Sequence, residues 1–219
     1  AVDEVLDERD KIIFHLMLDA GLRASEVCNL KKKDIDLENR LIYIHNSKFS
    51  GYVIRDVIDV SKYQGDINWV KVKQSGIDYA IIRAGFRGYG KSGSLNTDAN
   101  FVKNIESAVA AGMEVGVYIF SQAITQEEAC EEAQYILDLI DDYTISLPVV
   151  IDFEYASSSE GLTGRLYNAN LTKEKATMIC KEFCKIVENA GYTAMVYANK
   201  DMLENGLNAS EISDDYKIW

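Results

Sequence analysis

The amino-acid sequence predicts an α/β protein, in which a (β/α) barrel follows a small, mostly helical segment with a short β-hairpin. Two observations favour the barrel over residues 54–219: apolar runs of strand length alternate with stretches of helical periodicity, and six such runs are present. Strands that are separated by helices pair in parallel, because each parallel pair needs a crossover connection. Six candidates favour a barrel over a two-layer sandwich, and a doubly wound open sheet remains an alternative on periodicity alone.

The segment before the barrel differs in character from the rest of the chain. Residues 7–21 have the apolar spacing of a helix that ends at Gly21, and residues 24–30 suit a second short helix. Residues 41–45, with the sequence LIYIH, alternate as a strand does. The repetitive pattern begins only after Gly51, so we expect two domains, residues 1–53 and 54–219.

Within the second domain, the alternation defines each element in turn. The expected strands cover residues 57–60, 79–84, 115–120, 149–153, 194–197 and 217–219. The expected helices between them cover residues 67–74, 99–111, 126–141 and 173–189. Gly76, Gly112 and Gly191 follow the first, second and fourth of these helices, where a glycine commonly ends a helix.

Composition argues against several classes of function. The chain has 23 basic and 35 acidic residues, a net charge of −12, whereas a nucleic-acid surface needs clustered Lys and Arg. No run approaches the roughly 20 apolar residues of a membrane span, so we expect no membrane association. The acidic start, AVDEVLDERDK, does not have the features of a signal peptide.

The cysteines do not suggest a metal site. The four of them form no CxxC pair and have no histidine cluster nearby: Cys28, Cys130, Cys180 and Cys184. Cys180 and Cys184 lie one helical turn apart, so we expect them to pack in the core.

Three carboxylates lie at the ends of expected strands. Asp59 lies late in the strand 57–60, and Asp152 and Glu154 close the run LPVVIDFEY. The chemistry of parallel β/α folds collects at the carboxyl ends of the strands. Because strand side chains alternate, Asp152 and Glu154 share a face with Val150 and lie about 6.6 Å apart along the backbone.

Of two partly buried carboxyl groups at such a distance, one can act as a general acid and the other as a base or charged group. Their repulsion raises one pKa, which leaves one proton donor and one charged group. Glycosidic bond cleavage needs such a pair, and the backbone spacing does not distinguish retention from inversion of the anomeric centre. Alternatively, these acids are solvated or pair with Arg83 and Lys62, but burying charge directly after an apolar run is costly without a function.

Aromatic residues near these strand ends could stack on sugar rings. Each of them alone is more commonly a core or surface residue; the candidates are Tyr63, Trp69, Tyr118, Tyr155 and Tyr197.

Four segments of the sequence resemble segments of glycoside hydrolase family 25, the Chalaropsis-type lysozymes or N-acetylmuramidases, and they occur in the same order as in that family. They are VIDVSKYQGDINWVKVKQSGIDYAIIRAGFRGYG, VGVYIFS, PVVIDFEY and YTAMVYANK, in which DVSxxQG and DxE are the specific parts. The resemblance implies an irregular, flattened (β/α) barrel with its groove at the carboxyl ends of the strands. It also implies hydrolysis of the β-1,4 bond between N-acetylmuramic acid and N-acetylglucosamine in bacterial peptidoglycan.

The same resemblance implies roles for individual residues. Glu154 matches the general acid, Asp152 the carboxylate that orients or polarises the substrate's N-acetyl group, and Asp59 the acid of the first strand. The implied mechanism uses the substrate's own acetamido group and needs neither a metal nor an organic cofactor. Location outside the cell or at the cell wall is also implied. Candidate substrate contacts are Tyr63, Arg83, Tyr118, Tyr155 and Tyr197.

The carboxyl end of the chain departs from the family pattern. Members continue through further strands that carry another active-site Asp and a late aromatic motif, whereas this sequence stops at YKIW. We therefore expect a barrel that is incomplete at the C-terminus, with an open edge through which two copies could dimerise.

The first domain resembles the start of a tyrosine recombinase (phage integrase) catalytic domain. The matching sequence is DKIIFHLMLDAGLRASEVCNLKKKDIDLENRLIYIHNSK, whose GLRxSE element supplies Arg23 and whose hairpin supplies Lys48. That family also needs an HxxR element, but neither His15 nor His45 is followed by Arg three positions later. We expect no DNA strand cleavage and no catalytic role for Arg23 and Lys48.

Three functions therefore compete. A peptidoglycan hydrolase is the leading interpretation, and a non-catalytic scaffold that binds the cell wall is the first alternative. A DNA-recombination accessory fragment is the second, against which the net charge and the missing HxxR element weigh.

Overall fold

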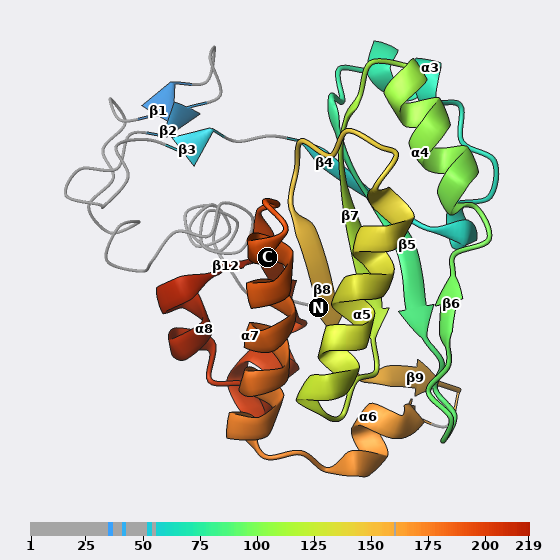
Figure 1. The fold of residues 1–219 in the computed structure, drawn as a ribbon. Helices are drawn as coiled ribbons and strands as arrows, with labels where there is room; N and C mark the ends of the chain where they lie inside the picture. Colours follow the sequence, from blue (N-terminus) through green and yellow to red (C-terminus); the bar gives the residue numbers. More distant parts are fainter. Residues whose placement is uncertain (1–34, 37–40, 43–51, 54–55, 160) are drawn as a thin grey trace. The chain divides into compact units, whose positions relative to one another are not determined.

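The computed structural model describes residues 35–36, 41–42, 52–53, 56–159 and 161–219 (Figure 1). The chain divides into two compact units, residues 1–56 and 57–219. The sequence analysis places the domain boundary three residues earlier, after residue 53.

The first unit contains a small antiparallel sheet. Its strands are β1 (Ile35–Asp36), β2 (Leu41–Ile42) and β3 (Tyr52–Val53), in the order β1-β2-β3. The strand β2 lies within the strand that the sequence predicts over residues 41–45, and its Ile42 lies opposite Ile35 of β1. The helices expected over residues 7–21 and 24–30 lie outside the described residues, as do Arg23 and Lys48.

The second unit is built on a seven-stranded sheet. Six of its strands lie in the order β12-β11-β8-β7-β5-β4, and β6 pairs with β5. In chain order they are β4 (Val57–Val60), β5 (Tyr79–Arg87), β6 (Leu95–Thr97), β7 (Glu114–Ser121), β8 (Val149–Phe153), β11 (Ala194–Tyr197) and β12 (Lys217–Ile218). Every neighbouring pair is parallel except β5 and β6.

The strand order distinguishes a barrel from a doubly wound sheet. Apart from β6, the strands follow one another across the sheet as they do along the chain. A doubly wound sheet reverses its order at a switch point, and this sheet does not. The result is the curled, half-barrel arrangement of a (β/α) barrel, as the sequence predicts. Within the described residues, β4 and β12 are its outermost strands, and dimerisation through this edge stays a prediction.

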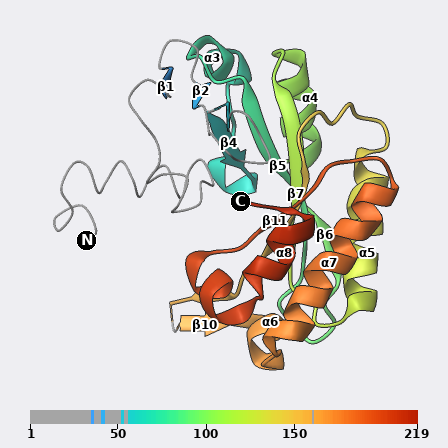
Figure 2. The same cartoon turned by 90° about the vertical axis from the view of Figure 1, so that its left-hand side faces the viewer.

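Helices connect the successive strands and cover one face of the sheet (Figure 1). They are α3 (Trp69–Gln74), α4 (Phe101–Ala110), α5 (Gln126–Ile140), α7 (Lys173–Asn189) and α8 (Ala209–Asp215). The four expected helices are confirmed, with ends that agree within two residues. Smaller elements follow strand ends: η2 (Lys62–Gln64), β9 (Ala156–Ser158), β10 (Gly161–Thr163), α6 (Gly164–Ala169) and η3 (Met202–Gly206), with α6, η3 and α8 visible together in the rotated view (Figure 2).

The helix ends follow local chemistry. Thr125 and Thr172 begin α5 and α7, where each side chain accepts a hydrogen bond from a backbone N–H in the first turn. Gly76, Gly112 and Gly191 have φ of 91°, 77° and 91°, a left-handed conformation that glycine adopts without steric cost.

The sheet separates two apolar layers. The larger lies between sheet and helices and includes Cys180 and Cys184, as expected from their spacing. The smaller lies on the opposite face and consists of Ile81, Tyr118 and Val150. Because Val150 faces away from the helices, the alternation along β8 turns Asp152 and Glu154 away from them as well.

The described ranges contain neither a membrane-spanning helix nor a metal-binding cluster of side chains. None of the helices there is long and apolar enough to cross a membrane. No group of three His, Cys, Asp or Glu side chains there is placed to hold a metal ion.

Candidate active site

The parallel register brings the predicted residues together at the carboxyl ends of the strands. Asp152 of β8 lies opposite Phe120 of β7 on one side and Tyr197 of β11 on the other. Directly paired residues of neighbouring strands project from the same face, so these three side chains are neighbours. Asp59 of β4 pairs with Ile81, which belongs to the same face.

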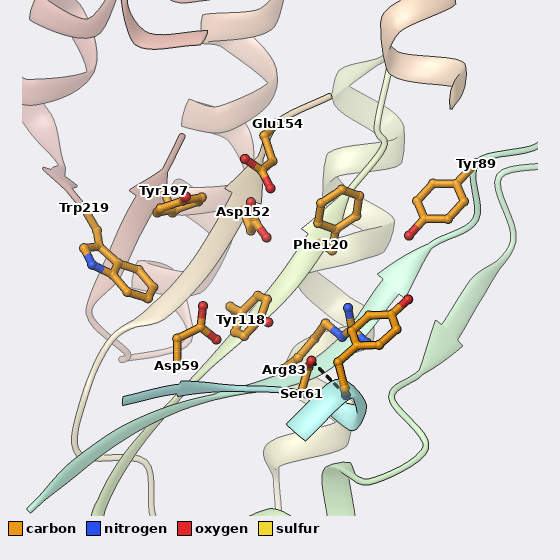
Figure 3. Close-up of a pocket in the computed structure, with 11 residues that line it drawn as sticks. Asp59, Ser61, Arg83, Tyr89, Tyr118, Phe120, Asp152, Glu154, Tyr197 and Trp219 are labelled. Carbon is orange, nitrogen blue, oxygen red and sulfur yellow. Dashed lines mark hydrogen bonds between the residues drawn. The ribbon is translucent and has the colours of Figure 1, made fainter. Parts of the chain in front are cut away.

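These side chains line a cavity of about 250 Å³. Figure 3 shows Asp59, Asp152 and Glu154 directed into one space, with Tyr118 and Phe120 between the carboxylates and Tyr89. The lining consists of Asp59, Ser61, Tyr63, Arg83, Tyr89, Tyr118, Phe120, Asp152, Glu154, Tyr197 and Trp219. Of the nine residues predicted for the site, Trp69 and Tyr155 are absent from this lining.

Asp152 is the most deeply buried of the three acids. Its exposed fraction is 7%, and its Oδ1 has no hydrogen-bond partner within the part of the chain that the structure describes. Burial raises the pKa of Asp152 well above its ordinary value, and the negative charges of Glu154 and Asp59 raise it further. A buried oxygen without a partner is costly, so it is a position where a ligand donor would be favourable.

Glu154 follows the end of β8 and is half-buried. Burial raises its pKa, a hydrogen bond from Asn199 opposes this effect, and Asp59 adds to it. Asn199 Nδ2 donates to Glu154 Oε2 at 3.1 Å. Gln122 Nε2 donates to the backbone oxygen of Glu154 at 3.1 Å. Both carboxyl groups of the DxE element therefore have raised pKa values, as a proton donor requires.

Asp59 keeps one side open to solvent. Burial of its other side raises its pKa, while a hydrogen bond from Tyr118 and the charge of Arg83 lower it. Burial and the neighbouring Asp59 raise the pKa of Tyr118, so this phenol stays protonated and donates to the carboxylate.

Arg83 brings a positive charge to the site without pairing with its carboxylates. Its Nη2 lies 2.6 Å from Oδ2 of the buried Asp98. The same oxygen accepts the backbone N–H of Lys62 at 3.1 Å. The ion pair with Asp98 thus holds the Arg83 guanidinium, and no ion pair between Arg83 and Asp59, Asp152 or Glu154 is present among the described residues.

The DVSKYQG segment forms a compact turn beside this pair. Ser61 and Gln64 make a capping box: the Ser61 hydroxyl accepts from Tyr63 N, and Gln64 Oε1 accepts from Ser61 N at 2.7 Å. The turn places the Tyr63 ring 5.1 Å from the Arg83 guanidinium carbon, within cation–π range. The specific part of the motif therefore positions Tyr63 at the cavity.

Aromatic side chains lie on two sides of the carboxylates. Tyr197 and Trp219 are in edge contact on one side, with ring centroids 5.1 Å apart. Tyr89 and Phe120 are in edge contact on the other, 5.9 Å apart. Tyr155 instead packs against Tyr167 at 5.4 Å, and Trp69 is buried in the core under the helices.

Several residues of the site were not predicted. Three of them bond to site residues that lie at least 15 positions away in the sequence, and a local sequence pattern does not predict such contacts: Asp98, Gln122 and Asn199. Phe120 could have been found, because it ends an expected strand on the face of Tyr118.

Paired carboxylates at the carboxyl ends of a parallel β/α sheet are what glycosidic bond cleavage requires. Fold and site together thus define the class of β/α-barrel glycoside hydrolases. The sequence profile of glycosyl hydrolases family 25 matches residues 58–219, and the chain belongs to this family. The profile of the phage integrase family matches residues 1–57, so both resemblances found in the sequence are confirmed.

Three known proteins show the extent of the similarity. The chain is 32% identical over 104 residues to Lysozyme M1 of Streptomyces globisporus, covering 46% of this chain and 33% of that one. It is 54% identical over 41 residues to Tyrosine recombinase XerA of Thermococcus onnurineus, covering 19% and 14%. The modular autolysin LytC from Streptococcus pneumoniae shares the fold, with a TM-score of 0.57 at 24% identity over 68% of this chain and 33% of LytC. The chain spans about a third or less of each of these proteins.

Proposed function

We propose that residues 57–219 hydrolyse peptidoglycan. The observation that carries this proposal is the closeness of Glu154 to the buried Asp152, whose Oδ1 has no partner among the described residues, in a cavity flanked by aromatic rings. Membership of family 25 supports it. LytC, which has the same fold, has been solved in complex with a synthetic peptidoglycan ligand.

The bond cleaved is the β-1,4 linkage between N-acetylmuramic acid and N-acetylglucosamine. Glu154 acts as the general acid that protonates the leaving oxygen, and its raised pKa keeps a proton available for this step. Asp152 accepts the N–H of the substrate's acetamido group through its unpartnered Oδ1. This contact would orient the acetamido oxygen toward the anomeric carbon as the bond breaks.

The remaining groups stabilise the charge of the transition state and bind the sugar rings. Asp59, fixed by Tyr118, adds negative charge near a centre that becomes positive in the transition state. The aromatic pairs offer stacking surfaces for sugar rings on both sides of the scissile bond. A substrate of this kind places the site of action outside the cell or at the cell wall.

The first prediction is that Glu154→Gln abolishes hydrolysis, because an amide cannot donate the proton. General acid catalysis contributes about 10²- to 10⁴-fold, so release of soluble reducing ends from purified bacterial cell walls should fall by that factor. Glu114→Gln is the matched control, since Glu114 is exposed at the amino end of β7, away from the cavity. Turnover of Glu154→Gln within threefold of the parent would remove Glu154 from this role.

The alternative function is binding to the cell wall without turnover. A pull-down with the same insoluble walls separates the two. Retention on the walls without any reducing ends from the parent protein would favour the binding scaffold and contradict the hydrolase.

A further inference from the structure

Two side-chain amides hold Glu154 from opposite ends of the residue. Gln122, at the end of β7, donates to its main-chain oxygen, and Asn199, just after β11, donates to its carboxylate. Gln122 therefore fixes the peptide, whereas Asn199 alone of these two contacts the group that would transfer the proton.

The orientation of the Asn199 amide is fixed by its other end. Its Oδ1 accepts the backbone N–H of Met202 at 2.9 Å, in the manner of a helix N-cap. A backbone N–H can only donate, so the oxygen must face Met202 and the nitrogen must face Glu154. The main-chain oxygen of Asn199 also accepts Leu203 N at 3.0 Å, which holds the residue in the same turn.

The two contacts together make particular demands on the side chain. Asp, Ser and Thr are also good capping residues, so the turn alone does not require Asn. An ionised Asp offers only acceptors, and Ser is too short to cap Met202 and reach Glu154 at once. A short side chain that accepts at one end and donates at the other meets both demands.

We propose that Asn199 is a positioning residue for the hydrolytic reaction. It caps the turn at Met202 with its oxygen and, through the amide held in this way, aims the Glu154 carboxyl group at the scissile bond. The inference rests on the proposed function of Glu154 as the general acid.

The electrostatic surroundings of Glu154 give this contact a measurable signature. Asp59 on β4, Asp152 on β8 and Tyr197 on β11 interact electrostatically with it, and the positive charge of Arg83 on β5 acts on Asp59 and Asp152. The hydrogen bond from Asn199 lowers the pKa of Glu154 against the effects of burial and Asp59. Loss of this donor should therefore raise the pKa further.

Two substitutions separate the donor from the cap. Asn199→Asp keeps the shape and the capping oxygen but replaces the donor with a second acceptor. Asn199→Ser keeps a capping hydroxyl without adding charge. Asn205→Asp is the matched control, because the exposed Asn205 lies in the same segment and its amide bonds only Asp201, at 2.8 Å.

We expect kcat on soluble peptidoglycan fragments to fall roughly 10- to 100-fold in both Asn199 variants, since small misplacements of a reacting group cost this much. KM should change little. A general acid is active when protonated, so a raised pKa should move the alkaline limb of the kcat profile to higher pH. Asn205→Asp should match the parent in all three respects, and parent-like kcat in the Asn199 variants would overturn the proposal.

A titration without substrate keeps this inference separate from the proposed function. The Glu154 carboxyl carbon, assigned by its loss in Glu154→Gln, is followed by carbon-13 NMR as the pH is raised. A midpoint that moves to higher pH in both Asn199 variants shows that the Asn199 amide acts on the Glu154 carboxyl group, and this result is obtained whether or not the parent hydrolyses peptidoglycan. Reduced turnover with an unmoved midpoint and an unmoved alkaline limb would mean that Asn199 acts only on the fold, which overturns the proposal.

Discussion

At the scale of single residues, Asp152 carries a free-energy cost that follows from its burial. Its pKa in the folded protein lies well above 3.8, the ordinary value that it has when unfolded. Between these two pKa values the folded state binds more protons than the unfolded state, so stability falls as the pH rises. The cost is complete above the folded pKa and vanishes below the unfolded one.

The second prediction is therefore that Asp152→Asn inactivates the protein and stabilises it at neutral pH. Each kcal/mol of relieved cost raises Tm by about 2–4 °C in a chain of this size. Thermal melts at pH 7 and pH 3 check the effect, which should be present at pH 7 and absent at pH 3. Asp214→Asn, an exposed change in α8, is the control.

Activity gives a separate check on the same residue. The proposed mechanism has Asp152 and Glu154 act as one unit, so the double variant should lose little more activity than either single variant. Losses that add on a logarithmic scale would contradict a shared mechanism, and a lower Tm for Asp152→Asn at pH 7 would contradict the burial cost.

Single residues also show which parts of the site can be predicted from the sequence. The two-residue period of a strand was sufficient to place Asp152 and Glu154 on one face. It could not reveal that Asp98 forms an ion pair with Arg83. Nor could it reveal that Asn199 donates a hydrogen bond to Glu154, which lies 45 positions earlier in the sequence. Such contacts depend on the register of separate strands, which no local pattern encodes.

At the scale of elements, a buried arginine joins the end of β5 to α5. Arg87 Nε lies 2.7 Å from Glu132 Oε1, and its other nitrogens bond the backbone oxygens of Gly93 and Glu128. Burial raises the pKa of Glu132 to about 6 despite the arginine. The strand that carries Arg83 is thereby held against its covering helix.

The third prediction is that Arg87→Met destabilises the protein by about 3–5 kcal/mol, because it leaves the buried Glu132 carboxylate without its counter-ion. The loss should be larger at pH 7 than at pH 5, where Glu132 can protonate. Urea unfolding at both pH values measures it. Adding Glu132→Gln should recover part of the loss, and no recovery would indicate that packing of the arginine matters more than its charge.

Helices and strands differ in how well they can be predicted from their sequences. Long helices such as α7 and buried strands such as β8 were predicted because their apolar periodicity spans several residues. The three-residue β6 was not, since its place depends on Gly85, where a Cβ would lie 2.7 Å from the backbone oxygen of Asn96. The shift in register between Arg83 and Gly85 occurs at the same point of β5.

At the scale of the whole molecule, the two parts of the sequence match two different families. The lining of the cavity comes from Asp59 to Trp219, within the second unit. The fourth prediction is that deleting residues 1–53 leaves hydrolysis of cell walls close to that of the parent, since the described lining of the cavity comes from the second unit. Reducing-end release at equal protein concentration measures it. A large loss, with the melting transition preserved, would show that the first unit contributes to the groove.

The contact between Tyr197 and Trp219 has an optical consequence. The chain has two tryptophans, of which Trp69 is 3% exposed in the core and Trp219 is 40% exposed at the cavity. A saccharide that enters the cavity would displace water from the Trp219 indole and should shift its emission to shorter wavelength, while Trp69 stays unchanged. The fifth prediction is that chitin oligosaccharides or muropeptides produce a saturable shift that Trp219→Phe removes and Glu154→Gln retains. The inactive variant would then report binding affinity directly, with its own indole as the fluorophore and no added label.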